Sequence, residues 1–183
     1  MSGDEALTIL TVSGKPGSGT STLVERIAEE RGWNSVNGGD VFRSEASRRG
    51  ISVEEFSRLC KEDLDVDRSL DTMLKDLLLS EKAPEIIESR LIGWWAHSLD
   101  IECLKVWIRV SDEERARRIV EREGLDYGTA LSVSRQRNED DMQRYRVLYG
   151  IDLDDMAPYD LIVDADSLNA DEVFSLVNSR IGE

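Results

Sequence analysis

Length, composition and charge restrict the kinds of protein that this chain can be. Its 183 residues predict one domain, large enough to bury a core without disulfides or metal ions. With 38 acidic against 23 basic side chains, the formal net charge is −15. Because such a charge repels a phosphate backbone and an anionic bilayer, we expect neither nucleic acid nor a membrane as a partner.

The remaining composition indicates a cytoplasmic protein with reduced thiols. The apolar run from Ala6 follows two acidic residues rather than the basic residues of a signal peptide, and no stretch reaches the length of a membrane span. Cys60 and Cys103 form neither a CxxC pair nor a ligand cluster. His97, the only histidine, has no nucleophile or second ligand beside it in the sequence, so we expect a structural role for it.

In chain order, the first predicted elements are a buried strand at 6–13 and an amphipathic helix that begins near Thr20. They are joined by "GKPGSGTS" at 14–21, which is close to the phosphate-loop pattern G-x-x-x-x-G-K-[ST]. Its glycines would turn backbone N–H groups inward, the helix N-terminus would favour an anion, and Ser21 could offer a hydroxyl to Mg²⁺. Thr20, however, stands where the pattern has lysine, so an ordinary glycine-rich turn stays open as the alternative.

The rest of the chain alternates between strands and helices. The predicted strands are at 33–39, 84–89, 102–110 and 159–165, and the predicted helices cover 40–80, a segment capped by Ser111, and 171–181. Glu114, three residues after Ser111, would complete a capping box. This alternation predicts an α/β fold with a parallel, helix-covered sheet of about five strands and ligands at the carboxyl ends of the strands. The helical stretch at 40–80 would be an insertion that covers the site.

Arginine is concentrated in one part of the chain. Nine of the 18 arginines lie between Arg109 and Arg146, whereas the whole chain has five lysines. A guanidinium group suits bidentate recognition of phosphate. Ion pairs on a helix surface would account for Arg115 and Arg117, but they explain the other arginines less well.

Further charged residues follow the predicted strands. Asp40 and Arg43 come after the second strand, and Glu88 and Arg90 come after the third. An acid near the hydroxyl of Ser21, with arginines from three separate loops, is the arrangement that phosphoryl transfer between two nucleotides requires, because this chemistry consists mainly of alignment and charge neutralisation. The residues themselves therefore indicate a phosphotransferase.

Several stretches resemble the nucleoside monophosphate kinase family, most closely cytidylate kinases of the archaeal type, from about residue 7 to residue 177. The resemblance rests on "GKPGSGTST", "GGDVFRSEASRRGISVEEFSRL", "IIESRLIGWW", "RARRIVEREG" and "RQRNEDDMQRYRVLYGIDLDD", followed by "YDLIVDADSLNADEVF". It implies a P-loop NTPase fold in one domain over 1–183, with an NMP-binding insertion at about 40–80 and a LID segment at about 112–147. Ser89 stands where these kinases tend to have glycine, which would restrict a close backbone approach.

The resemblance also implies roles for single residues. In the family, the RIVxR pattern supplies donor-site arginines, and the R-x-x-x-D-x-x-R spacing reads the cytosine and the phosphate of the acceptor. The residues implied for ATP are Gly14, Lys15, Pro16, Gly17, Ser18, Gly19, Thr20, Ser21, Thr22, Arg118 and Arg122, and those implied for the acceptor are Asp40, Arg43, Arg90, Arg137, Asp141 and Arg144. Lys15 matches the signature lysine of deviant phosphate loops, and it would be catalytic together with Arg118 and Arg137. Ser21 and Glu88 would hold Mg²⁺.

The implied reaction is transfer of the γ-phosphoryl group of ATP to CMP or dCMP by a monomeric, magnesium-dependent enzyme. Two alternatives stay open. Adenylate or another small acceptor could be the substrate on the same fold, since a fold alone does not determine the acceptor. The protein could also bind a nucleotide without catalysis, because Thr20 cannot supply the positive charge that normally follows the transferred group.

Overall fold

Five parallel strands form the centre of the molecule, and the computed structural model describes residues 8–182 apart from the side chains of Glu54 and Ser57. The strands are β1 (Leu10–Gly14), β2 (Ser35–Asn37), β3 (Ile86–Glu88), β4 (Leu104–Arg109) and β5 (Leu161–Asp164), in the order β2-β3-β1-β4-β5. Leu10 of β1 is level with Ile86 of β3 and with Leu104 of β4. These three strands therefore run in step toward the same edge of the sheet.

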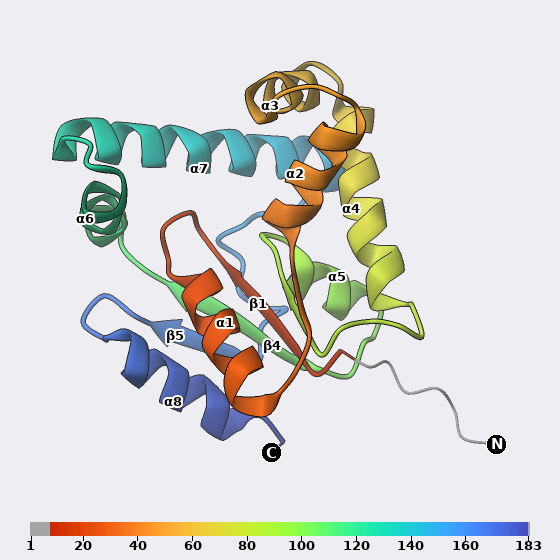
Figure 1. Cartoon of the computed structure of the whole chain (residues 1–183), viewed down its shortest axis with the longest axis vertical. Helices are drawn as coiled ribbons and strands as arrows, with labels where there is room; N and C mark the ends of the chain where they lie inside the picture. Colours follow the sequence, from red (N-terminus) through yellow and green to blue (C-terminus); the bar gives the residue numbers. More distant parts are fainter. Residues whose placement is uncertain (1–7, 183) are drawn as a thin grey trace.

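Helices cover both faces of this sheet (Figure 1). They are α1 (Thr20–Arg31), α2 (Gly38–Arg48), α3 (Val53–Glu62), α4 (Leu64–Leu78), α5 (Ile92–Ser98), α6 (Asp112–Glu123), α7 (Tyr127–Tyr149) and α8 (Ala170–Arg180). On one face, α1 and α8 pack against a buried cluster that includes Val12 and Val106. On the other face, α5 packs against a second cluster that includes Ile87 and Trp95. The strands are apolar on both sides because both faces of a parallel sheet are covered.

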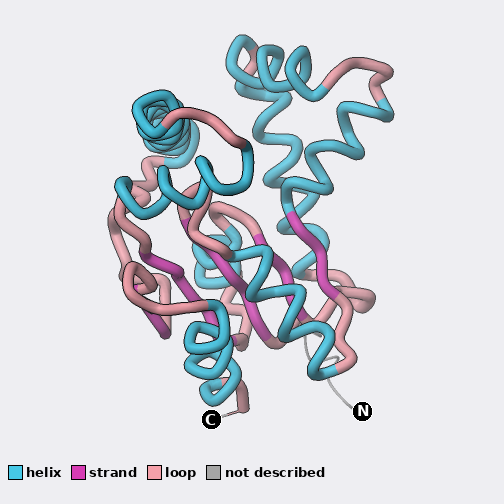
Figure 2. Tube along the Cα trace, turned by 60° about the vertical axis from the view of Figure 1, so that its left-hand side comes forward, coloured by secondary structure: helices cyan, strands magenta, loops and turns pink. Residues whose placement is uncertain are grey.

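Two further groups of helices gather at one end of the strands (Figure 2). The first group, α2 to α4, packs around Phe56, Cys60 and Leu70, and the second group, α6 and α7, packs around Ala116, Ile119 and Ala130. Figure 1 shows α7 stretching across the molecule from α6 to the first group, where Lys61 of α3 pairs with Asp140 of α7 at 2.9 Å. Among the helices of residues 8–182, none is both long and apolar enough to cross a membrane.

The predicted fold class is confirmed, with five parallel strands flanked by helices. The helical stretch predicted at 40–80 is three helices rather than one. Gly50, with φ of 71°, follows the end of α2, and the side chain of Asp63 caps α4 by accepting from the N–H of Asp65. Two helices are not among the predicted elements: α5, whose seven residues are too few to show a helical period, and the single 23-residue helix α7.

The capping box predicted at the start of α6 is only half present. The Oγ of Ser111 accepts a hydrogen bond from the N–H of Glu114 at 3.2 Å, as predicted. The carboxylate of Glu114 does not return to the N–H of Ser111, and it accepts hydrogen bonds from Arg117 and Arg118 instead. Charged partners one turn along the helix hold the carboxylate of Glu114, and the N–H of Ser111 donates to Oδ1 of Asp166 at 2.7 Å instead.

Gly93 of α5 packs against the loop before β5. It is buried against Tyr159, whose ring packs on Trp107 with centroids 5.2 Å apart. A Cβ placed on Gly93 overlaps the ring of Tyr159, so Gly93→Ala should force the aromatic pair apart. We expect a loss of about 1 to 3 kcal/mol in the free energy of unfolding, measured by urea denaturation.

Gly128→Ala is the matched control. Gly128 is exposed in the first turn of α7, and a Cβ placed there would meet only Oδ1 of Asp126, at 3.3 Å. Because alanine is the better helix former, this variant should keep or slightly raise the free energy of unfolding. An equal loss in both variants would contradict the explanation by packing.

Candidate active site

A cavity of about 420 Å³ lies at the carboxyl edge of the sheet. Its lining comes from the loop after β1, from the ends of β2 and β3, and from both groups of helices at this edge. The volume lies within the usual range for small-molecule sites. The phosphate loop and part of the predicted arginine set therefore share one space.

The loop at 14–19 has three positions that favour glycine, two through their backbone conformation and one through lack of space. Gly17 and Gly19 have φ values of 81° and 83°, in the left-handed region. A Cβ on Gly14 would lie 2.8 Å from Cγ2 of Thr20. Because α1 begins at Thr20, its free N-terminal N–H groups lie directly beside the loop. This strand, loop and helix can bind a phosphate group.

A buried carboxylate, Glu88, connects three segments of the site. Its Oε1 accepts hydrogen bonds from the hydroxyl groups of Thr20 at 2.5 Å and Ser21 at 3.1 Å. Its Oε2 accepts one from Nδ2 of Asn37 at 2.5 Å. Burial raises the pKa of Glu88, and these hydrogen bonds oppose the rise. Thr20 therefore binds the acid of the site, at the position where the usual pattern has a lysine.

Asn37 is a site residue that the sequence analysis missed. It is the last residue of β2 and lies in register with Glu88 of β3. Its Oδ1 also accepts a hydrogen bond from the N–H of Gly39 at 2.6 Å and so caps α2. Asparagine before two glycines is a turn or cap signal in the sequence. The contact with Glu88 depends on strand order, which the sequence does not display.

Ser89 does not prevent the backbone at the end of β3 from lying close to the start of α2. A Cβ on Gly38, the first residue of α2, would lie 2.7 Å from Cβ of Ser89. The room that Ser89 takes is therefore provided by a glycine on the neighbouring segment.

The oxygen atoms of Ser21 and Glu88 fit a magnesium ion, which prefers hydroxyl, carboxylate and water oxygens. Within residues 8–182, no group of three or more His, Cys, Asp and Glu side chains could hold a metal ion by itself. This partial donor set suits an ion that takes its remaining ligands from water and from nucleotide phosphates.

A second polar cluster lines the other side of the cavity. Nε of Arg90 lies 3.1 Å from Oδ2 of Asp141, and Nη2 of Arg144 lies 2.9 Å from Oδ1 of Asp141. Nε of Arg144 also lies 2.7 Å from Oδ2 of Asp67. All four side chains are 25% exposed or less. The structure thus brings Arg90, Asp141 and Arg144 together, and two carboxylates balance the charge of Arg144.

Asp67 and Asp71 on α4 are further cavity residues that the sequence analysis missed. Burial raises the pKa of Asp67 to about 6, although the charge of Arg144 opposes the shift. Burial also raises the pKa of Asp71, which accepts a hydrogen bond from the hydroxyl of Tyr149 at 2.6 Å. Both acids lie at the spacing of the buried leucines of α4, so helical periodicity indicates burial for them. It does not indicate that they face a cavity.

The two arginines predicted for the donor side lie on α6 next to the loop. The guanidinium group of Arg118 donates to the carbonyl oxygens of Ser18 at 3.3 Å and Ala165 at 2.8 Å, and it pairs with Glu114 at 3.1 Å. Arg122, one turn further along α6, lines the cavity itself. Arg118 therefore contacts the backbone of the loop, whereas Arg122 can reach a ligand in the cavity.

The expectation of surface ion pairs is wrong for Arg115. Its side chain is completely buried, and its guanidinium group pairs with Asp112 and donates to the carbonyl oxygen of Pro16 at 3.1 Å. Arg117, by contrast, is 66% exposed and pairs with Glu114 at 3.2 Å, as expected. The two arginines differ because only the first faces the packed interface between α6 and the loop.

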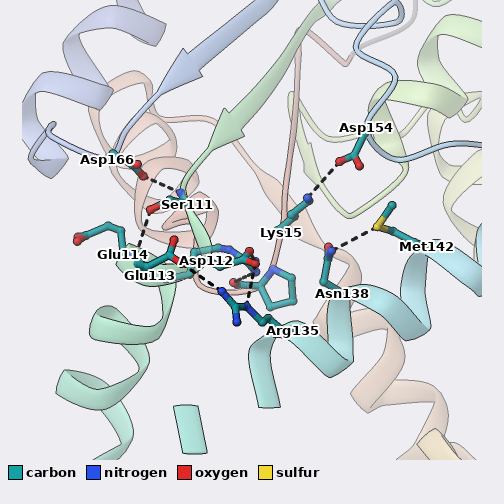
Figure 3. A network of polar contacts seen from close by, with 12 residues as sticks. Lys15, Ser111, Asp112, Glu113, Glu114, Arg135, Asn138, Met142, Asp154 and Asp166 are labelled. Atoms are coloured by element: carbon teal, nitrogen blue, oxygen red, sulfur yellow. Dashed lines mark hydrogen bonds and ion pairs between the residues drawn. The ribbon is translucent and has the colours of Figure 1, made fainter. Parts of the chain in front are cut away.

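Lys15 lines the cavity and lies close to Asp154, with which it is joined by a dashed line in Figure 3. Its Nζ pairs with Oδ1 of Asp154 at 3.1 Å, in the segment between α7 and β5. The lysine side chain is 23% exposed, whereas Asp154 is 61% exposed. Lys15 therefore belongs to the loop, but its charge is directed to an acid outside the loop.

Three of the residues predicted to bind the acceptor do not line the cavity. Asp40 and Arg43 form an exposed ion pair with each other at 2.5 Å. Arg137 is exposed on α7, and no hydrogen bond or ion pair joins it to another residue in the described part of the chain. To contact an acceptor in the cavity, these side chains would have to leave their present conformations, or α2 and α7 would have to move.

Comparisons with known proteins show the family of this chain. The cytidylate kinase-like family matches residues 9–167. A cytidylate kinase of Archaeoglobus fulgidus is 39% identical over 168 residues, which cover 92% of this chain and 91% of the relative. A cytidylate kinase of Methanothrix thermoacetophila is 42% identical over 156 residues, which cover 85% of this chain and 87% of the relative.

The fold is also similar to that of a more distant kinase. The crystal structure of shikimate kinase from Bacteroides thetaiotaomicron matches with a TM-score of 0.61 at 13% identity, covering 94% of this chain and 96% of that one. Such a low identity shows a common fold alone. The family match and the archaeal relatives confirm the recognition and the enzyme class predicted from the sequence. The chain belongs to the cytidylate kinase-like family of kinases.

Proposed function

We propose that this chain is a magnesium-dependent cytidylate kinase that acts as a cytoplasmic monomer. It would transfer the γ-phosphoryl group of ATP to CMP or dCMP and release ADP with CDP or dCDP. The observation that carries the proposal is the single cavity in which the phosphate loop faces Arg90, Asp141 and Arg144. A loop alone would bind one nucleotide, whereas a second charged cluster in the same space offers a place for an acceptor. The names of the archaeal relatives support CMP as that acceptor.

On the donor side, the phosphates of ATP would lie against the N–H groups of the loop and of the first turn of α1. Ser21 and Glu88 would hold Mg²⁺, which when bound neutralises charge on the phosphates. Arg122 would reach the same phosphates from α6. Lys15 would join them once it leaves Asp154, and Arg118 would keep the loop against α6.

On the acceptor side, Asp141 would accept a hydrogen bond from the amino group of cytosine, and Arg90 and Arg144 would bind oxygens of the ribose and the phosphate. The acceptor phosphate oxygen would attack the γ-phosphorus directly, so no protein nucleophile is needed. The segments at about 40–80 and 112–147 would close over both nucleotides and bring in Arg43 and Arg137. Closure would exclude water and so prevent hydrolysis of ATP.

A panel of acceptors tests the proposed function. The protein is incubated with ATP, Mg²⁺ and one of CMP, dCMP, UMP or AMP, and the nucleoside diphosphates are separated by chromatography. CDP or dCDP should form fastest, and EDTA should stop the reaction. Faster conversion of AMP would favour the adenylate alternative. Binding of ATP without any diphosphate product from an acceptor would favour a protein that binds nucleotides without catalysis.

Asp141→Asn tests how the base is read. A carboxylate only accepts hydrogen bonds, which suits the amino group of cytosine, whereas uracil presents a carbonyl oxygen there. An amide can donate to that carbonyl. We expect the ratio of kcat/KM for CMP to kcat/KM for UMP to fall at least tenfold, which is about 1.4 kcal/mol.

Asp140→Asn is the matched control for this substitution, because Asp140 is the neighbouring acid and pairs with Lys61 rather than with a cavity arginine. Its ratio should equal that of the parental enzyme. If Asp141→Asn also leaves the ratio unchanged, Asp141 does not read the base.

Lys15→Ala tests what replaces the missing lysine of the loop. A lysine that bridges the transferred phosphoryl group stabilises the transition state, whereas one that stays with Asp154 contributes almost nothing. We expect kcat to fall at least tenfold, about 1.4 kcal/mol, with little change in the thermal midpoint, because the ion pair is partly exposed. Lys82→Ala, at an exposed loop position, is the control. A parental kcat for Lys15→Ala would leave the arginines as the sole source of positive side-chain charge.

A further inference from the structure

Two arginines of α6 hold the phosphate loop from the side away from the cavity. Nη1 of Arg115 donates to the carbonyl oxygen of Pro16 at 3.1 Å, and Nη1 of Arg118 donates to the carbonyl oxygen of Ser18 at 3.3 Å. Gly17, between these two residues, packs directly on α6, since a Cβ placed on it would lie 3.5 Å from Cβ of Arg115. The loop therefore rests on α6 along three consecutive residues.

The complete burial of Arg115 indicates a specific task for its guanidinium group. A buried charge is costly unless it is paired and hydrogen-bonded. Arg115 pairs with Asp112, and Asp112 pairs in turn with Arg135 of α7 at 3.3 Å (Figure 3). Because Asp112 neutralises Arg115, this arginine cannot replace the charge of the missing lysine. Its remaining effect on the loop is the orientation of the Pro16 carbonyl group.

This orientation also determines the direction of an N–H group. The described peptide bonds are trans, and in a trans peptide the C=O and N–H bonds point in opposite directions. With the Pro16 carbonyl directed at Arg115, the N–H of Gly17 is directed away from it, and Gly17 lines the cavity. Within residues 8–182, this N–H donates to no acceptor. It is therefore available to an oxygen atom of a ligand.

We propose that Arg115 is a positioning residue for the donor nucleotide: it holds the Pro16–Gly17 peptide so that the N–H of Gly17 faces a phosphate oxygen. The inference rests on the proposed function, in which the phosphates of ATP bind this loop. Losing one hydrogen bond to a charged ligand group weakens the binding of that ligand by roughly tenfold or more. A loop without its lysine depends more strongly on such backbone donors.

Substitutions on one helix test this role. Arg115→Met removes the contact with Pro16, Arg115→Lys keeps a charge and one donor, and the exposed Arg117→Met is the matched control. In Arg115→Met, KM for ATP should rise at least tenfold while KM for CMP stays within twofold of the parental value. Arg115→Lys should give an intermediate KM for ATP, and Arg117→Met should match the parent.

The two Michaelis constants separate positioning from a purely structural role, because a structural role would lower the thermal midpoint without raising KM for ATP alone. A parental KM for ATP in Arg115→Met would overturn the inference. If this variant does not fold, the same comparison is made with Arg115→Lys, for which a parental KM would be equally decisive.

A measurement on the parental protein complements the variants. In ¹⁵N-labelled protein, the N–H signal of Gly17 should shift on addition of ADP, and by more than that of Gly32, a glycine with positive φ at the far end of α1. A shift at Gly17 no larger than at Gly32 would overturn the inference. The same titration separates this inference from the proposed function. A large shift at Gly17 in a protein that does not phosphorylate CMP would contradict CMP as the acceptor, but it would still support binding of the donor phosphate at Gly17.

Discussion

The common direction and register of β1 and β3 decide where the polar groups of the site lie. Parallel strands bring their carboxyl ends to one edge, so the loop after β1 stands beside Glu88 at the end of β3. β2 adds Asn37 in register with Glu88. Because both faces of the sheet are packed against helices, a shift in register would move each side chain of a strand to the opposite face and disrupt this packing, so the register holds the polar groups in place.

Charge in the cavity is balanced before a nucleotide binds. The guanidinium groups of Arg90 and Arg144 are interleaved with the carboxylates of Asp141 and Asp67, which removes the repulsion between neighbouring cations. The acids are buried in this cluster, and burial raises the pKa of Asp67 although the charge of Arg144 opposes the rise. In the proposed reaction, an arriving phosphate would exchange partners with a carboxylate rather than meet isolated positive charge.

The loop shows that the backbone and the charge of a phosphate-binding motif are separable. The positive φ values of Gly17 and Gly19 and the support of the loop carbonyls by α6 do not involve residue 20. Thr20 instead donates to Glu88 and so ties the first turn of α1 to β3. A chain can therefore keep the shape of this loop without its lysine. In the proposed reaction, the positive charge at the donor phosphates would come from other residues.

The sequence by itself determined the order of the five strands along the chain and the position of the glycine loop, because apolar periodicity and glycine conformation are local properties. It also predicted Arg90, Asp141 and Arg144 as site residues, through the position of their motifs and a family resemblance, and all three line the cavity. Only the tertiary structure decided which face of α4 lines the cavity and how α6 meets the loop. Arg115 and Arg117 carry the same side chain two residues apart, yet packing between distant segments buries the first and exposes the second.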